Sequence, residues 1–135
     1  MYCAIMQLFK CLDKREVHMN DQEIVKTIAD GFKTCSKMLV AIGDETRQHL
    51  ILEMIKMGKC EGVRVSEITE RTNLSRPAVS HHLQIMKDAG IVRSRKEGTK
   101  IYYYFDPEME VFSRLVDTLT LAMELTKSLP DRRGE

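Results

Sequence analysis

The sequence predicts a mainly α-helical domain that contains one β-hairpin. Apolar side chains recur at helical spacing in a stretch near each end, segments with helix-capping residues lie between these stretches, and two β-rich runs flank Glu97-Gly98-Thr99. The 135 residues, of which 43% are hydrophobic, give room for one domain of ordinary size with a buried core. We expect this domain to span residues 20–130, after an N-terminal extension of residues 1–19 and before a charged tail, residues 131–135.

Two interpretations of residues 1–19 stay open. Apolar side chains at helical spacing indicate a short amphipathic helix, and they are Tyr2, Ile5, Met6, Phe9 and Leu12. The alternative is a disordered extension, with the folded unit starting near Met19. The segment lacks a basic leader and a small-residue cleavage site, and the chain lacks a run of about 18 apolar residues, so we expect a cytoplasmic protein without a membrane span. In that compartment the four cysteines, Cys3, Cys11, Cys35 and Cys60, should be thiols.

Two amphipathic helices are predicted next. The first begins after Asn20, a residue type that favours the N-cap position, and ends at Gly43. Its apolar face consists of Ile24, Val25, Ile28, Phe32, Cys35 and Leu39. The second begins after Asp44 and ends at Gly58, and its buried side is predicted to consist of Leu50, Ile51, Met54 and Ile55.

A short strand and a short helix are predicted between residues 63 and 71. Val63 to Val65 alternate as in a strand. Ser66 is predicted to cap a helix that runs to about Arg71, with Ile68 pointing inward. A tight turn, Thr72-Asn73-Leu74, then leads into the next helix.

That next helix is predicted to begin after Ser75 and to end at Gly90, with Pro77 in its first turn, where a missing N–H costs no hydrogen bond. With Val79 at the centre of the buried face, steps of about 100° per residue place Leu83, Met86 and, on the flank, His82 beside it. Four polar side chains project outward or to the sides, and they are Arg76, Ser80, His81 and Gln84. Ile85 also projects outward, and the sequence offers no reason for an apolar residue there.

A β-hairpin is predicted from Ile91–Arg95 and Lys100–Phe105, because both runs are rich in β-branched and aromatic residues. Strand alternation places Arg93 and Arg95 on one face. Lys96 and Lys100 flank the tip at Gly98, and the three tyrosines, Tyr102 to Tyr104, are expected to pack rather than to stack on bases. The hairpin therefore presents a group of cations suited to phosphates.

A last helix is predicted to open at Pro107 and to end before Pro130. Its apolar stripe consists of Phe112, Leu115, Val116, Leu119, Ala122 and Met123. The first and last helices together carry more hydrophobic surface than one small domain can cover, so we expect a homodimer formed through these two helices.

Positive charge is concentrated between Arg64 and Lys100. This segment has eight basic and four acidic residues, a net charge of +4, whereas residues 1–63 are balanced and residues 101–135 have a net charge of −3. A surface that meets phosphates is predicted there. The predicted order of elements is helix, tight turn, helix and basic hairpin. This is the order in a winged helix-turn-helix domain, whose second helix enters the major groove of DNA.

Several segments resemble the ArsR/SmtB family of bacterial regulators. They are Ala41-Ile-Gly-Asp-Glu-Thr-Arg47, Leu74-Ser-Arg-Pro-Ala-Val-Ser-His-His-Leu83 and Asp88-Ala-Gly-Ile-Val92, followed by the Arg93–Tyr104 hairpin. The resemblance covers about half of the chain, from Leu39 to Phe105. It implies a winged-helix fold, a dimer built by the first and last helices, and repression that a signal relieves. Arg76 stands where members of the family often have Gln.

The sensor sites common in that family are missing. The Cys-Val-Cys positions read Arg64-Val65-Ser66, the last helix has Asp117 but no His or Cys from there to Leu129, and the helix from Asp44 to Met57 has no Cys. We therefore predict no metal site and no cofactor. A thiol- or metal-responsive regulator that uses non-standard ligands stays open as an alternative. Its candidate ligands are Cys3, Cys11, His18, Cys35, His49 and Cys60.

These observations predict a DNA-binding transcriptional regulator, a dimeric repressor of an imperfect palindromic operator in double-stranded DNA, whose effector the sequence does not identify. The predicted DNA-binding residues are Ser75, Arg76, Ser80, His81, Gln84, Lys87, Arg93, Arg95, Lys96 and Lys100. A winged-helix module for protein–protein contact is the second alternative. An enzyme is not expected, because the sequence has neither a glycine-rich phosphate loop nor a pairing of nucleophile and base.

Overall fold

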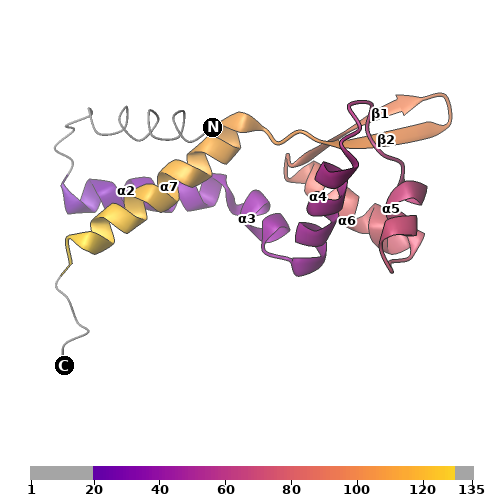
Figure 1. Ribbon diagram of the computed structural model, residues 1–135. Coiled ribbons are helices and arrows are strands. Elements are labelled where there is room, and N and C mark those ends of the chain that lie inside the picture. Colours follow the sequence, from indigo (N-terminus) through magenta and orange to yellow (C-terminus); the bar gives the residue numbers. More distant parts are fainter. Residues whose placement is uncertain (1–19, 130–135) are drawn as a thin grey trace.

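The computed structural model describes residues 20–129, so the predictions for residues 1–19 and 131–135 lie outside the described residues. Helices and a hairpin follow one another along the chain (Figure 1). They are α2 (Asp21–Thr34), α3 (Ser36–Ile42), α4 (Glu45–Met57), α5 (Val65–Arg71), α6 (Arg76–Asp88), β1 (Val92–Glu97), β2 (Lys100–Phe105) and α7 (Met109–Lys127). Among these helices, none is long and apolar enough to cross a membrane.

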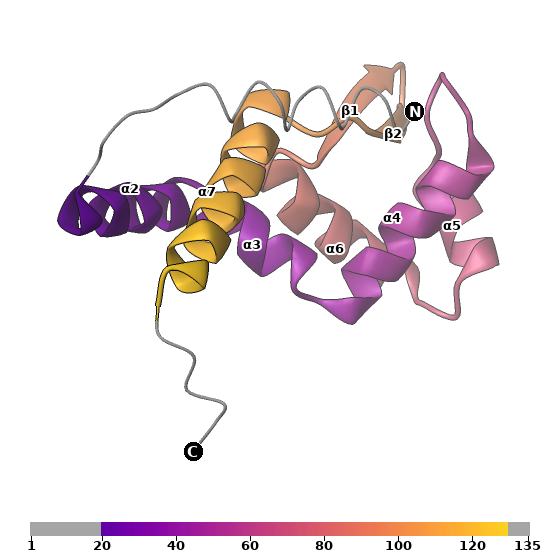
Figure 2. The ribbon, with the colours of Figure 1, turned by 60° about the vertical axis from the view of Figure 1, so that its left-hand side comes forward.

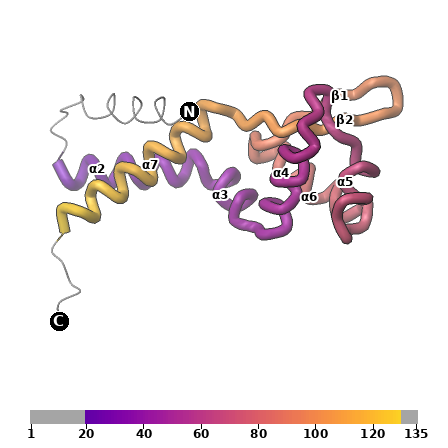
Figure 3. The backbone as a smooth tube through the Cα atoms, viewed as in Figure 1, coloured from indigo at the N-terminus to yellow at the C-terminus, as the bar shows by residue number. Residues whose placement is uncertain are grey.

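The elements fall into two regions. Figures 1 and 2 both show the first and last of the described helices, α2 and α7, lying against each other at one end, and α4, α5, α6 and the hairpin grouped at the other, with α3 between them. The tube in Figure 3 shows the chain leaving α6, passing out and back through the hairpin, and continuing into α7. The predicted winged helix-turn-helix arrangement is confirmed.

One predicted helix is in fact two. The helix that begins after Asn20 breaks at Cys35, whose backbone angles of φ −94° and ψ 6° leave the helical range. Cys35 is fully buried there, and its thiol lies 3.6 Å from the carbonyl oxygen of Val111 in α7. Because of the break, α2 can pack along α7 while α3 packs against α6. The prediction of one continuous helix to Gly43 was wrong.

The core lies in the second region. Its fully buried side chains come from α3, α4, α5, α6, the start of β1 and Ile91 just before it. The largest are Met38, Leu50, Ile68, Leu83, Met86, Ile91, Val79 and Val92. The Asp44 side chain caps α4 by accepting from the Arg47 N–H at 3.0 Å, and Gly58 ends that helix with φ 57°, as predicted. Ile55 was predicted to be buried but is 53% exposed, because it lies at the edge of the α4 face that packs inward.

The predicted strand at residues 63–65 is reduced to a single bridge. Val63 pairs with Tyr103 of β2 through two backbone hydrogen bonds of 2.7 and 2.8 Å, and helix α5 begins at Val65. The prediction that Ser66 caps α5 was wrong. Instead, Glu67 accepts from the Arg64 N–H at 2.8 Å, so the cap lies two residues earlier.

The hairpin is closed at both ends. Its strands pair in antiparallel register from Val92 opposite Phe105 to Glu97 opposite Lys100, which leaves a two-residue turn, Gly98-Thr99. At the base, the Glu108 N–H donates to the Gly90 carbonyl at 2.7 Å, and the Asp106 N–H donates to the Ile91 carbonyl at 3.3 Å. Because these residues hold the base, α7 begins at Met109 and not at Pro107 as predicted.

Helices α2 and α7 cross closely at Gly31. A Cβ atom on Gly31 would overlap Oγ1 of Thr118, so only glycine fits this crossing. Leu115 is buried, but three members of the predicted apolar stripe, Val116, Leu119 and Met123, are 45–61% exposed. Val25 and Phe32 of α2 are also exposed, so the terminal helices present uncovered apolar surface.

Candidate nucleic-acid interface

Helix α6 separates its polar and apolar side chains. Ser75 caps it by accepting from the Ala78 N–H at 3.3 Å, and Val79, Leu83 and Met86 are fully buried. The predicted DNA-binding residues of this segment all reach the surface, and they are Ser75, Arg76, Ser80, His81, Gln84 and Lys87. The face thus offers hydroxyl, imidazole, amide and cationic groups to a partner.

Ile85 does not belong to that exposed face. It is half-buried and packs against the core, where Val40 and Lys37 of α3 line a pocket beside it. The buried face of α6 is therefore wider than the face predicted by centring it on Val79, because α3 covers a second side of the helix.

One acidic residue lies next to this face. Gln84 Nε2 donates to the Asp88 carboxylate at 2.8 Å, one turn along the exposed surface. Since this bond uses one of the two N–H donors of the amide, the second N–H and the carbonyl oxygen of Gln84 are left for a partner.

The four cations of the hairpin are not equivalent. Arg93 lies 3.2 Å from the Asp106 carboxylate. Arg95 donates to the Glu61 carbonyl at 3.0 Å, lies 3.6 Å from Glu97 and stacks 5.4 Å above the Tyr102 ring. The sequence indicates only Glu97 as a counter-charge, so Arg93 and Arg95 are more neutralised than expected.

Lys96 and Lys100 are the exposed cations at the tip of the hairpin. The register places Arg93, Arg95 and Lys100 on one face and Lys96 on the other, beside Ile101. A partner that approaches the tip can contact both lysines, whereas a partner that lies along one face contacts only one.

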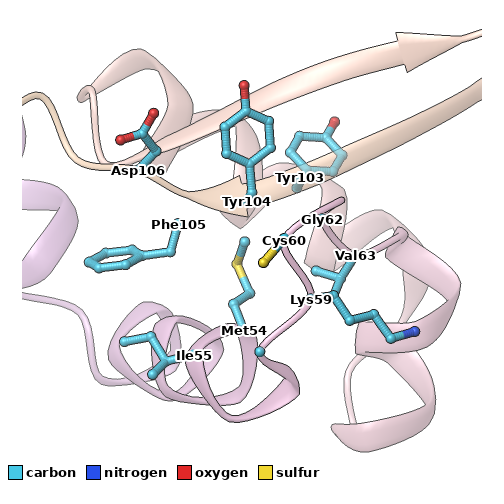
Figure 4. Close-up of a pocket in the computed structure, with 11 residues that line it drawn as sticks. Met54, Ile55, Lys59, Cys60, Gly62, Val63, Tyr103, Tyr104, Phe105 and Asp106 are labelled. Carbon is cyan, nitrogen blue, oxygen red and sulfur yellow. The ribbon is translucent and has the colours of Figure 1, made fainter.

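A pocket of about 380 Å³ lies under the hairpin, between the end of α4, the loop after it and β2 (Figure 4). Its lining combines apolar side chains with the exposed thiol of Cys60. Its two charged residues are engaged elsewhere, Asp106 with Arg93 and Lys59 with Glu67. The hydrogen bond from Lys59 lowers the pKa of Glu67, and the Arg64 N–H adds to this effect.

Cysteine and histidine side chains do not gather into a metal site in the part of the chain that the structure describes. Residues 20–129 contain no group of three His, Cys, Asp or Glu side chains that could hold an ion. Cys35 is buried in the core, as expected, and Cys60 is exposed in the loop after α4.

Sequence reasoning missed one functional candidate, Arg47. The sequence shows it only as part of a family motif, yet the residue is just 8% exposed and its guanidinium reaches both α3 and α6. A charged residue on the inner side of an amphipathic helix was the available signal, because burial of Arg requires partners.

This order of helices with a hairpin after the second helix of the turn defines the chain as a winged helix-turn-helix protein. The fold is shared with the homodimeric winged helix-turn-helix DNA-binding domain of a possible ArsR-family regulator from Mycobacterium bovis, with a TM-score of 0.52 and 18% identity, over 86% of this chain and 99% of that one.

Sequence comparison places the chain more narrowly. The family model described as bacterial regulatory protein, arsR family, matches residues 45–94. An uncharacterized HTH-type transcriptional regulator of Methanocaldococcus jannaschii is 35% identical over 91 residues, which are 67% of this chain and 99% of that protein. The transcriptional repressor SdpR of Bacillus subtilis is 40% identical over 63 residues, 47% of this chain and 66% of that protein. The chain belongs to the arsR family of transcriptional regulators.

Proposed function

We propose that this regulator is a homodimeric repressor that recognises an imperfect palindromic operator through α6 and the hairpin, acting on DNA by binding and not by catalysis. The observation that carries the proposal is the exposed face of α6, where Ser80 and His81 project from a helix whose opposite side is fully buried. The similarity to SdpR, which is named a repressor, supports the direction of regulation.

Dimerisation is supported by the apolar surface of the terminal helices. Val116, Leu119 and Met123 of α7 are 45–61% exposed, and Val25 and Phe32 of α2 add to this surface. Apolar surface of this extent is characteristic of an interface. A second copy related by a two-fold axis would place two α6 helices on half-sites about one helical turn, ~34 Å, or a multiple of it apart.

The roles assigned to α6 and to the hairpin differ and can be separated. Base contacts discriminate between sequences, whereas phosphate contacts strengthen binding to all of them. We expect Ser80→Ala with His81→Ala to reduce the preference for the operator over scrambled DNA by roughly tenfold. Replacing Lys96 and Lys100 by Ala should weaken binding to both DNAs equally. Each lysine that no longer meets a phosphate should also reduce the slope of the salt dependence by about one.

Mobility-shift titrations on the DNA upstream of the gene, at several salt concentrations, measure both quantities. Lys56→Ala, an exposed cation of α4 that lies 2.8 Å from Glu53, is the control for removal of positive charge. Affinity that does not depend on salt, or no preference for any duplex selected from a random pool, would contradict operator binding and favour a protein-binding module.

The signal that releases the operator is a separate question. A thiol-responsive mechanism would have to use Cys60 or the cysteines of residues 1–19, since Cys35 is fully buried. Operator binding by the Cys60→Ser protein after treatment with an oxidant or a soft metal tests that alternative directly.

A further inference from the structure

Arg47 is a charged side chain buried where α3, α4 and α6 meet. Its Nε donates to the Ala41 carbonyl at 2.7 Å and its Nη2 donates to the Val40 carbonyl at 3.0 Å. Both carbonyls belong to the last turn of α3, where helix carbonyls lack partners within the helix. The guanidinium therefore caps α3 and offsets the negative end of its dipole.

The remaining edge of the guanidinium faces α6. Nη1 of Arg47 lies 3.4 Å from Nδ1 of His82. A guanidinium can only donate hydrogen bonds, so the His82 ring has to accept at Nδ1, which requires the neutral ring with its proton on Nε2. His82 is half-buried at the edge of the exposed face, next to His81 and two residues after Ser80.

We propose that Arg47 and His82 form a positioning pair that sets the rotation of α6 about its axis, and that operator preference depends on the neutral His82 ring. This inference rests on the proposed function. The apolar contacts of Val79, Leu83 and Met86 hold α6 against the core, but apolar packing does not depend on direction and so leaves some freedom of rotation. A hydrogen bond depends on the angle between donor and acceptor and therefore restricts that rotation. Base-edge contacts depend on a few tenths of an ångström, so the rotation of α6 decides whether Ser80 and His81 reach a base.

Protonation of His82 would remove the acceptor and place a second cation against Arg47. Asp44 of α4, close to both residues, attracts a cation, while His81 of α6 has its ring centroid 5.9 Å away. Lys37 of α3 faces α6 further along the helix, beside the Asp88 carboxylate. A charged His82 ring would stand 3.4 Å from the Arg47 guanidinium, and repulsion between two cations at this distance disrupts the pair.

The test compares two substitutions of similar size. His82→Asn keeps an acceptor near the position of Nδ1 but does not titrate, and His82→Leu removes the acceptor. With an operator selected by the parent protein at neutral pH, we expect His82→Leu to lower the ratio of operator to scrambled-DNA affinity about five- to tenfold, and His82→Asn to keep it within about twofold. Arg47→Lys should lower the ratio as His82→Leu does, because an ammonium cannot span both α3 and α6.

The pH dependence of the operator preference is a second measurement. A variant that is only less stable than the parent would not change it. Between about pH 8 and 5.5, the range in which histidine side chains generally change charge, the operator preference of the parent should fall relative to that of His82→Asn. His81 is present in both proteins, so its effect cancels in this comparison. His49→Asn, at an exposed position of α4, should leave the profile of the parent unchanged. Circular dichroism and thermal melts establish that each variant is folded.

A constant ratio between the parent and His82→Asn across this pH range, or full operator preference in a folded His82→Leu protein, would overturn the positioning pair while operator binding stands. A parent protein that does not distinguish its selected operator from scrambled DNA would instead overturn the proposed function.

Discussion

The block of helices α3 to α6 and the pair formed by α2 and α7 are built from similar apolar stripes. The two regions differ in how far these stripes are buried. In the block, Leu50, Leu83 and Met86 are completely buried within one chain. In the pair, Leu119 and Met123 occupy equivalent places in a helical stripe and are 45% and 61% exposed. An apolar stripe therefore indicates that a surface packs against something but not what covers it. Among the described residues, α2 and α7 are helices whose stripes stay largely exposed.

The largest effect should come from the closed block. Leu83→Ala removes a fully buried side chain, and we expect the free energy of unfolding to fall by about 3 kcal/mol, because the cavity is enclosed on all sides. Leu119→Ala should change it by less than about 1 kcal/mol in protein diluted until it is monomeric. Urea titrations measure both, and similar decreases at both sites would remove the distinction between the regions.

The next effect concerns association. A carboxylate at the centre of the uncovered stripe, Leu119→Asp, should weaken the dimer by about 2 kcal/mol, roughly 30-fold, because the charge would be desolvated in the interface. Leu52→Asp is the matched control, since Leu52 is a 53% exposed leucine on α4, in the other region. Sedimentation equilibrium reports the dissociation constants, and equal values for the two variants would show that α7 is not the interface.

A smaller effect is expected at the crossing of the terminal helices. Gly31→Ala places a methyl group against Thr118, and helices forced apart should reduce the free energy of unfolding by about 1.5 kcal/mol. Thr118→Ala in the same chain should restore much of this stability, because it removes the two nearest atoms, Oγ1 and Cγ2. Thermal melts of the single and double variants check this, and a Gly31→Ala protein as stable as the parent would mean that the crossing is loose.

The smallest effect is a pH dependence within the block. The hydrogen bond from the Arg47 N–H lowers the pKa of the Asp44 carboxyl group in the folded protein. The carboxylate therefore contributes stability above the pKa that it has in the unfolded chain, and this contribution is lost as the pH falls through the folded pKa. Asp44→Asn keeps an N-cap acceptor but does not titrate, so we expect a shallower decrease of stability below about pH 4. Asp30→Asn, at an exposed position of α2, controls for net charge. If the stability of the parent and of Asp44→Asn fell equally steeply below about pH 4, this role of the carboxylate would be contradicted.

What the sequence predicts well is local. Asp44, Ser75, Gly58 and Gly90 are identifiable as helix ends because capping hydrogen bonds and positive φ angles involve neighbouring residues only. The break at Cys35 has no such signal. Neither glycine nor proline marks it, and it exists because α2 and α3 pack on different helices.

The candidate site shows the same division. Exposure of Ser80, His81 and the hairpin lysines follows from helical and strand periodicity, which the sequence displays directly. The ion pair of Arg93 with Asp106 joins β1 to the residue that follows β2, and the contact between Arg47 and His82 joins residues 35 positions apart. Only the folded chain brings such residues together, so their electrostatic effects were not predicted.

The closed base of the hairpin has a consequence for how this regulator can vary. The chain leaves the end of α6 at Gly90 and returns beside it at Glu108, joined by a 2.7 Å hydrogen bond, while at the far tip a Cβ on Gly98 would meet no atom within 4 Å. We therefore expect that pairs of residues added to or removed from the tip would leave the separation of the two α6 helices in the proposed dimer unchanged. In that dimer, the length of DNA touched outside each half-site and the spacing between half-sites would be independent quantities.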